Sequence, residues 1–424
     1  MKSYITLCFR CFGIYLLLCA SNVFSQNCSN ISVGYPPISD LGLGYWHGAQ
    51  GGLYPGGSNF IPAAHMTAGL NIANNIQPLD TNGNVDAVNG KIVWVSMGMS
   101  NTTQETQAFI PMTDTFAQKN PKCKLVDCAQ GGQAIVQMLD TTGVYWPTVT
   151  ARLAASGVRA KQVEVMWFKQ AEISPTDTGF STYPVALKNK FKQAMRLCKL
   201  KFPNLKLCYL SSRIYAGYAT TALNPEPYSY YSGWSVKWLI EDQINGDTNL
   251  TYAGTTPRSA WLAWGPYLWA DGTTPRSDGL TWICPTDFNS DGTHPSTAGR
   301  QKVASLLFNF FSTDSTSVPW FLINSAAGVD EVKNNIEELM LFPNPVKNKL
   351  AVSSGQLVMM SAYITNSLGE RVKQIVDSGQ SFIASQLSTD NKQLTFDVSD
   401  LRNGIYFVVV ITEKKILAAK FIKQ

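Results

Sequence analysis

The chain has 424 residues and a formal net charge of +5, with 45% hydrophobic and only 15% charged residues. This length suits two or three domains rather than one small module, and the composition is typical of a folded chain, which excludes general disorder. The cationic residues are scattered and not clustered, which argues against a nucleic-acid-binding face.

Residues 1–26 have the three-part layout of a secretory signal peptide. A short basic start is followed by an apolar run from Cys11 to Ala20, and then by small and polar residues up to Gln26. The run is shorter than the roughly 20 apolar residues that span a bilayer. We therefore expect an exported, soluble mature protein without an integral membrane span.

Six of the nine cysteines follow this segment: Cys28, Cys123, Cys128, Cys198, Cys208 and Cys284. An even number in an exported chain permits disulfides. Cys198 and Cys208 could bridge a predicted helix to the next strand, but the sequence does not decide the pairing. Those six contain no CxxC pair and the chain has only three His, so a zinc site is disfavoured. We expect neither a metal nor an organic cofactor.

Residues 27–90 are rich in Gly, Pro and Asn. Turn signals outnumber any periodic apolar pattern there. The pattern predicts an extended, loop-rich lead-in that packs on the domain behind it.

Residues 91–311 alternate apolar runs with helical stretches, the pattern of βαβ units in a three-layer α/β/α parallel sheet. Continuous apolar runs are typical of strands buried on both faces. The predicted strands are 92–95, 124–128, 162–167, 205–210 and 260–264. The predicted helices are 104–119, 146–156, 184–201, 232–245 and 297–311.

After residue 311, the sequence pattern changes twice. Residues 312–338 lose the alternating rhythm and are predicted to be a linker. Residues 339–424 contain short β-branched or alternating runs separated by Gly, Asn and Asp turns, which predicts a small all-β sandwich.

Two short motifs carry residue types suited to acyl transfer. Ser100 follows the first strand of the predicted sheet, at the edge where open parallel sheets collect reacting groups. Asp291 precedes His294 by three residues, so its carboxylate can reach the imidazole and leave the other ring nitrogen free to take a proton from a serine. The alternatives are a helix-capping Ser and a plain polar turn.

Four blocks in order, GMSN, AQGGQAI, MWFKQAE and DGTHPS, resemble those of SGNH/GDSL hydrolases. They are most similar to the branch with sialate O-acetylesterases and acetylxylan esterases. The resemblance implies a flavodoxin-like α/β fold and a serine esterase that removes acyl groups, most plausibly acetyl, from a carbohydrate. It implies Ser100 as nucleophile, His294 as general base and Asp291 as its orienting carboxylate.

The same resemblance implies an oxyanion hole made by the Ser100 backbone N–H, the backbone N–H of Gly131 or Gly132, and the Gln170 side chain. The third block departs from the family pattern, because one extra residue separates Trp167 from Gln170 and Lys169 could intrude. A non-catalytic carbohydrate-binding protein on a degenerate site, or a lipolytic esterase, therefore stays open.

Aromatic residues crowd the stretch before the DGTHPS block. Apolar sugar faces stack on such side chains, so Trp264, Trp269 and Trp282 are candidate substrate-binding residues. The alternative is that they are ordinary core residues.

The tail from about Leu341 to Gln424 resembles the type A C-terminal sorting domain of type IX secretion substrates. It carries LFPNP near its start, then SLGERV, LRNGIYF and a closing KFIK. The resemblance implies an immunoglobulin-like sandwich that is recognised by an outer-membrane translocon. It implies a protein that is secreted or held on the outer surface of a Gram-negative bacterium.

Overall fold

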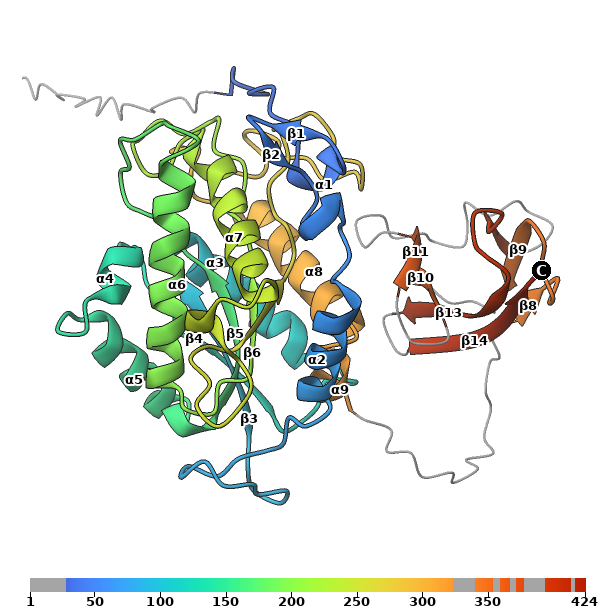
Figure 1. Ribbon diagram of the computed structural model, residues 1–424, viewed down its shortest axis with the longest axis horizontal. Coiled ribbons are helices and arrows are strands. Elements are labelled where there is room, and N and C mark those ends of the chain that lie inside the picture. Colours follow the sequence, from blue (N-terminus) through green and yellow to red (C-terminus); the bar gives the residue numbers. More distant parts are fainter. Residues whose placement is uncertain (1–27, 324–339, 354–358, 367–370, 377–392, 413–415) are drawn as a thin grey trace, which may run out of the picture.

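The computed structural model describes residues 28–323, 340–353, 359–366, 371–376, 393–412 and 416–424. The predicted signal peptide and most of the predicted linker lie outside these residues. Residues 28–323 form an α/β domain, and the described residues of the tail form an all-β domain (Figure 1).

A five-stranded parallel sheet lies at the centre of the α/β domain, with the strand order β4-β3-β5-β6-β7. This is the flavodoxin-like order, which confirms the expected fold class. The strand order reverses between β3 and β5, because β4 is added on one side of β3 and the later strands are added on the other side. In open α/β sheets a ligand crevice is expected at the carboxyl ends of the two strands at such a switch point. The strands are β3 (Ile92–Gly98), β4 (Cys123–Asp127), β5 (Val163–Lys169), β6 (Leu207–Leu210) and β7 (Trp261–Trp264).

Helices cover both faces of this sheet (Figure 1). On one face, Trp94 of β3 contacts Phe109 and Phe311, with ring centroids 5.7 Å apart in both cases. On the other face, Phe168 of β5 contacts Phe191 at 5.3 Å. The first face carries α2 (Ala63–Ala73), α3 (Ser100–Asp114) and α8 (Thr297–Thr313); the second carries α4 (Ile135–Leu139), α5 (Tyr145–Ala155), α6 (Tyr183–Lys201) and α7 (Tyr228–Ile244).

Helix α3 begins at Ser100, four residues before the predicted start at Gln104. Asn and Thr are weak helix formers, so the first turn has little signal in the sequence. Tertiary contacts stabilise it instead, because Thr102 Oγ1 donates to the Lys169 carbonyl at 2.8 Å. This shift puts Ser100 on the first helical residue rather than in a loop.

The lead-in packs on the sheet and contains more regular structure than its composition suggests. It holds α1 (Ile38–Leu41), the strands β1 (Tyr45–Trp46) and β2 (Ala49–Gln50), the 3-10 turn η1 (Pro55–Gly57) and α2. In α2, the His65 ring bonds the Leu262 carbonyl of β7 at 2.8 Å. Gly69 of α2 lies so close to Trp261 that an added Cβ would stand 2.4 Å from the indole. The 3-10 turns η2 (Ala160–Gln162) and η3 (Thr248–Leu250) lie later in the domain.

The predicted linker starts too early. Residues 312–323 belong to the α/β domain, because α8 runs to Thr313 and a short helix, α9 (Val318–Phe321), follows. Trp320 and Phe321 are buried, and both contact Phe311. These two aromatic rings are core residues, and polar residues around them hid this in the sequence.

The tail consists of two antiparallel sheets, as the predicted small β-sandwich requires. Their orders are β11-β10-β13-β14 and β12-β9-β8. Side chains from both sheets, among them Leu350, Ile364 and Val408, are fully buried in one shared core. The strands are β8 (Met340–Phe342), β9 (Lys349–Ser353), β10 (Met359–Asn366), β11 (Arg371–Val376), β12 (Gln393–Asp397), β13 (Gly404–Thr412) and β14 (Ile416–Lys423).

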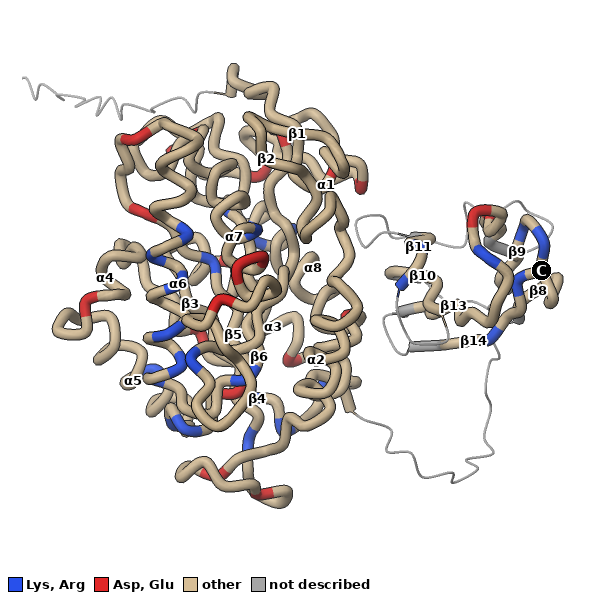
Figure 2. Tube along the Cα trace, viewed as in Figure 1, with Lys and Arg blue, Asp and Glu red and all other residues tan. Residues whose placement is uncertain are grey.

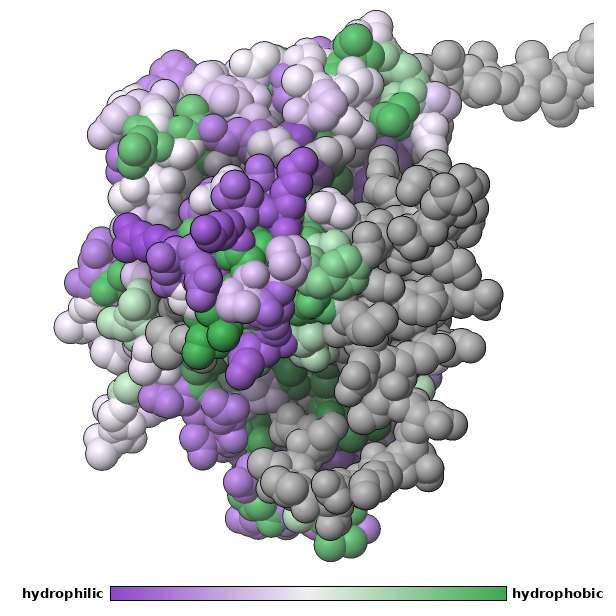
Figure 3. Space-filling model, turned by 90° about the vertical axis from the view of Figure 1, so that its right-hand side faces the viewer, coloured by the Kyte–Doolittle hydropathy of each residue, from purple (hydrophilic) through white to green (hydrophobic). Residues whose placement is uncertain are grey.

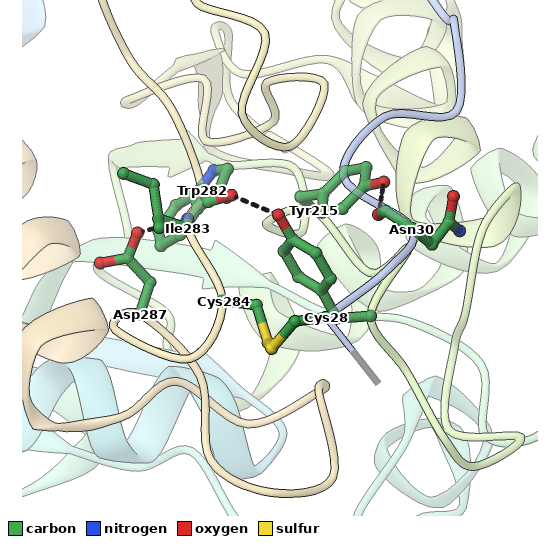
Figure 4. The surroundings of a disulfide bond; sticks show 8 residues. Cys28, Asn30, Tyr215, Trp282, Ile283, Cys284 and Asp287 are labelled. Atoms are coloured by element: carbon green, nitrogen blue, oxygen red, sulfur yellow. Dashed lines mark hydrogen bonds between the residues drawn. A yellow bond between two sulfur atoms is a disulfide. The ribbon is translucent and has the colours of Figure 1, made fainter. Parts of the chain in front are cut away.

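A disulfide joins Cys28 to Cys284 (Figure 4). The pairing considered between Cys198 and Cys208 is wrong: both thiols are free and buried. Next to the disulfide, the Tyr215 hydroxyl donates to the Asn30 carbonyl at 2.7 Å. The bond thus anchors the start of the lead-in to the loop that leads to Asp291.

Replacing Cys28 or Cys284 with serine should lower the free energy of unfolding by about 2–4 kcal/mol. The bond links residues 256 positions apart, so its loss frees a long loop in the unfolded chain. Urea unfolding of the wild type with and without reducing agent measures the effect. The double variant Cys28→Ser/Cys284→Ser should have the stability of the reduced wild type, and reducing agent should not change it. A double variant as stable as the oxidised wild type would contradict the prediction.

A buried carboxyl in β5 makes stability depend on pH. Glu164 is fully buried, and burial raises its pKa to about 7 although Lys206 lies 2.8 Å away. In the unfolded chain, Glu164 has its ordinary pKa of 4.5 and loses its proton above that pH. In the folded state, it keeps the proton up to about pH 7. The resulting stabilisation is complete below pH 4.5 and is lost as the pH rises through 7.

We expect the wild type to lose about 3 kcal/mol of stability between pH 4.5 and pH 7.5, relative to Glu164→Gln. The glutamine variant has no carboxyl to ionise at this position. Urea unfolding of both proteins at several pH values gives the difference. Parallel curves for the two proteins would contradict the raised pKa.

Charges of both signs are spread over the described chain (Figure 2). On the face shown in Figure 3, hydrophobic residues occur in separate groups among hydrophilic ones. No helix within the described ranges is long and apolar enough to cross a membrane.

Candidate active site

Ser100 lies at the carboxyl end of β3, next to the switch point of the sheet. The preceding Met99 is extended and buried, and Ser100 itself is half-buried. A Cβ at Gly98 would stand 2.2 Å from both the Lys169 carbonyl oxygen and Thr102 Oγ1. Glycine is therefore needed there for β3 to end this close to β5 and α3.

A chain of hydrogen bonds joins Ser100 to Asp291 through His294. Ser100 Oγ lies 2.8 Å from His294 Nε2, and His294 Nδ1 lies 2.5 Å from Asp291 Oδ2. Asp291 Oδ1 also accepts the backbone N–H of His294 at 2.9 Å. With the proton on Nδ1, Nε2 can accept the proton of the serine hydroxyl. Residues 194 positions apart in the chain thus meet in one reactive arrangement.

The Asp291–His294 turn is held from two sides. Asn101 Nδ2, next to Ser100, donates to the Thr293 carbonyl at 3.0 Å and is buried. The Thr220 backbone N–H donates to the Asp291 carbonyl, also at 3.0 Å. Gly292 has φ +62°, and a Cβ there would stand 1.8 Å from the Tyr218 carbonyl oxygen. The turn therefore has little freedom to swing away from Ser100.

Asp291 is suited to stay ionised beside the imidazole. Burial opposes its ionisation, but the backbone N–H and ring of His294 and the N–H of Thr293 outweigh burial and hold its pKa below the ordinary value. An ionised carboxylate stabilises the imidazolium that forms when His294 takes a proton.

Gly131 and Gly132 lie in the loop after β4, and this loop adjoins Ser100. A Cβ built on Gly131 would be 3.8 Å from Ser100 Cβ, and Gly132 has φ +71°. The loop is tied down because the Gln130 N–H donates to the Gly98 carbonyl at 2.9 Å. The loop therefore lies beside Ser100, and the role of its backbone N–H groups in an oxyanion hole stays a prediction.

Gln170 lies in the same region with its side chain engaged on both sides. Its Nε2 donates to the Gln133 carbonyl and its Oε1 accepts from the Ala171 N–H, both at 2.9 Å. These bonds join the glycine loop to the end of β5. Only the second N–H of the amide is left for the predicted role in the oxyanion hole.

Lys169, the extra residue of the third block, is still part of β5 and does not reach Ser100. It is buried and its Nζ lies 2.5 and 2.6 Å from the two carboxylate oxygens of Glu105, which is also buried. Burial lowers the pKa of Lys169 to about 8 and raises that of Glu105, because both charges are removed from water. The pair joins β5 to α3, the helix that begins at Ser100.

The predicted substrate-binding role of Trp264, Trp269 and Trp282 is wrong. All three are buried, with exposures of 3%, 0% and 0%. Their indole N–H groups donate to the Leu53 carbonyl, to Glu226 and to the Leu268 carbonyl, respectively. They are core residues, so no sugar can stack on them.

Three structurally important residues were assigned no role from the sequence. Gly98 and Asn101 belong to the first block, GMSN, and their position beside the serine was the available signal. Glu105 had no such signal, because a single Glu in a helical stretch does not indicate that its side chain is buried. Its function became visible only with Lys169 placed beside it.

The tail is the part of the chain whose family is decided by comparison. Residues 340–424 match the family described as "Secretion system C-terminal sorting domain". This segment is a type IX secretion sorting domain. The protein is therefore exported, to the cell surface or the medium.

No curated protein matches the chain. Among solved structures, a Bacteroides fragilis protein assigned as an acylhydrolase is 12% identical, with a TM-score of 0.33, over 61% of this chain and 100% of its own. A GDSL-like lipase from Bacteroides thetaiotaomicron is 11% identical, with a TM-score of 0.29, over 58% of this chain and 95% of its own. Neither similarity is strong enough to indicate an activity for this chain.

Proposed function

We propose that the α/β domain is a serine esterase that removes a short acyl group, acetyl above all, from a carbohydrate. The observation that carries the proposal is the chain from Ser100 through His294 to Asp291, with distances of 2.8 and 2.5 Å. An alcohol, an imidazole and a carboxylate in this order are the parts of a nucleophilic acyl-transfer site.

In the proposed reaction, Ser100 Oγ bonds to the ester carbonyl carbon while its proton passes to His294 Nε2. The carbonyl π electrons move onto oxygen and form a tetrahedral oxyanion. As this intermediate collapses, the bond to the sugar oxygen breaks and that oxygen takes the proton from His294. Water, deprotonated by His294, then attacks the acyl-serine; the bond from the acyl carbon to Ser100 Oγ breaks, His294 returns its proton to that oxygen, and the carboxylic acid leaves.

The oxyanion needs hydrogen-bond donors that are aimed at it before the reaction begins. The nearest candidates are the backbone N–H groups of Ser100, at the start of α3, and of Gly131 or Gly132. Removing one donor of such a site typically lowers kcat by about 10²–10³-fold. The remaining N–H of Gln170 is a third candidate.

The carbohydrate part of the proposal rests on the resemblance of the four sequence blocks, together with export. An exported esterase meets extracellular esters, and polysaccharide acetyl groups are one such class. The three tryptophans no longer support this part, since they are buried.

Activity on a graded set of esters tests the proposal. We expect release of acetate from acetylated xylo-oligosaccharides and from p-nitrophenyl acetate, with rates that fall from acetate through butyrate to octanoate. A preference for octanoate would instead identify a lipolytic enzyme. A folded wild type that binds acetylated sugars but hydrolyses none of these esters would identify a non-catalytic binding protein.

A further inference from the structure

An unpaired cation lies at the same edge of the sheet as Ser100. Arg213 follows β6 and is only 5% exposed. Its backbone N–H donates to Ser232 Oγ at 2.9 Å, which holds its main chain on α7. Its Nε is buried and has no hydrogen-bond partner among the residues that the structure describes.

Two carboxyl groups, Glu105 and Glu226, interact electrostatically with this cation, but the hydrogen bonds of both go to other residues. Glu105 gives both oxygens to Lys169. Glu226 accepts N–H groups of Ala216 and Tyr230 and the indole of Trp269. A buried guanidinium without a partner is costly, so a structure retains it where a ligand supplies the missing acceptor. Burial lowers the pKa of Arg213, as expected for a charge held away from water.

Two other buried polar atoms, in the segments that follow β5 and β6, also lack partners among the residues that the structure describes: the Tyr183 hydroxyl and Asn224 Oδ1. Tyr183 lies within the electrostatic range of both Arg213 and Glu172, and Asn224 Nδ2 donates to the Glu172 carbonyl. Their exposures are 4% and 1%. Together these groups offer a guanidinium and a hydroxyl to an anion, and one oxygen to a ligand hydroxyl.

The position of Arg213 relates this cluster to the proposed site. Strand β6 pairs with β5, with Leu210 opposite Phe168, so Arg213 lies in the segment that continues past the end of β5 at Lys169. The same segment runs on to Thr220, whose N–H bonds Asp291. One stretch of chain thus connects the unpaired cation to the turn that carries His294.

We propose that Arg213, with Tyr183 and Asn224, binds a carboxylate carried by the substrate, so that the ester acted on at Ser100 belongs to an acidic sugar. Arg is the side chain best matched to a planar carboxylate, because its N–H groups bind both oxygens. This inference rests on the proposed function for the ester, while the binding of the acid itself is a separate property.

Kinetics on a matched pair of substrates tests the preference. Acetylated methyl glucuronoside and acetylated methyl glucoside differ only in the carboxylate. We expect the wild type to favour the acid at least about tenfold in kcat/KM, in line with one charge-assisted bidentate contact. Arg213→Gln should lose the preference, because its kcat/KM for the acetylated glucuronoside falls to its value for the acetylated glucoside. Exposed Arg258→Gln is the control and should retain the preference.

Binding without turnover separates this inference from the proposed function. Calorimetry with Ser100→Ala and unacetylated methyl glucuronoside should show binding that Ser100→Ala/Arg213→Gln loses at least about tenfold. If the protein binds the acid but hydrolyses no ester, the result would support the Arg213 site and reject the proposed esterase activity. Active enzyme with equal kcat/KM for both sugars, and no binding of the acid, would overturn the Arg213 site and leave ordered water as its partner.

A stability measurement guards against a merely structural effect. If Arg213 serves a ligand, Arg213→Gln should unfold at the same temperature as the wild type or higher, because an unpaired buried charge is removed. Tyr183→Phe, which removes only the hydroxyl, should lower kcat/KM for the acidic sugar alone. A large fall in melting temperature for Arg213→Gln, with Tyr183→Phe unchanged toward both sugars, would contradict the ligand role.

Discussion

Replacing Ser100 with alanine is expected to lower kcat for p-nitrophenyl acetate by about 10⁴-fold or more, with little change in KM. The hydroxyl that lies 2.8 Å from His294 is the only part removed, so the substrate still binds but no acyl-enzyme forms. Steady-state kinetics at saturating ester measures the loss, and rapid mixing should show that the burst of p-nitrophenol disappears.

Ser181→Ala is the matched control, because Ser181 is exposed in the loop before α6. It should hydrolyse the ester at the wild-type rate. Both variants should unfold at the wild-type temperature, since Ser100 is only half-buried. If Ser100→Ala retained wild-type turnover, the acyl-enzyme mechanism would have to be abandoned.

Replacing Glu105 with glutamine should destabilise the α/β domain by about 3–5 kcal/mol. The change leaves Lys169 buried opposite a neutral amide. Lys169→Met should cost less, because burial already raises the pKa of Glu105 and this carboxyl can take up a proton once its partner is gone. Urea unfolding gives the free energies, and the order of the two variants tests whether Glu105 becomes neutral without Lys169.

An ion pair with an exposed carboxylate at the end of the same helix provides the comparison. Asp114, near the end of α3, pairs with Lys119 and has a side chain that is 58% exposed. Asp114→Asn should change the free energy of unfolding by about 1 kcal/mol or less, because water screens that pair. Equal effects for Glu105→Gln and Asp114→Asn would mean that the buried pair does not hold α3 on β5.

Local pattern was sufficient for most of the architecture. The continuous apolar runs predicted all five strands of the parallel sheet, because a strand buried on both faces has few polar positions. The β-sandwich of the tail could be predicted equally well, since its alternating runs and turn residues recur at short intervals. Helix α3 was mispredicted at its start because Asn and Thr there depend on contacts with β5.

The candidate site was also predictable only in part. Ser100, His294 and Asp291 could be proposed from short motifs, because the carboxyl end of a strand and the turn before a helix are local features. Whether they meet depended on the fold, which brings the loop before α8 to the start of α3. The tryptophans were misassigned because aromatic side chains suit sugar binding and a hydrophobic core equally well, and composition does not distinguish the two.

The linear order of residues therefore reveals what depends on neighbours in the chain: strand and helix type, export and the reactive motifs. The folded chain alone reveals what depends on distant partners. The Cys28–Cys284 bond, the Lys169–Glu105 pair and the unpaired Arg213 each result from segments brought together across the sheet. Burial and charge compensation are properties of that three-dimensional environment, so no local pattern encodes them.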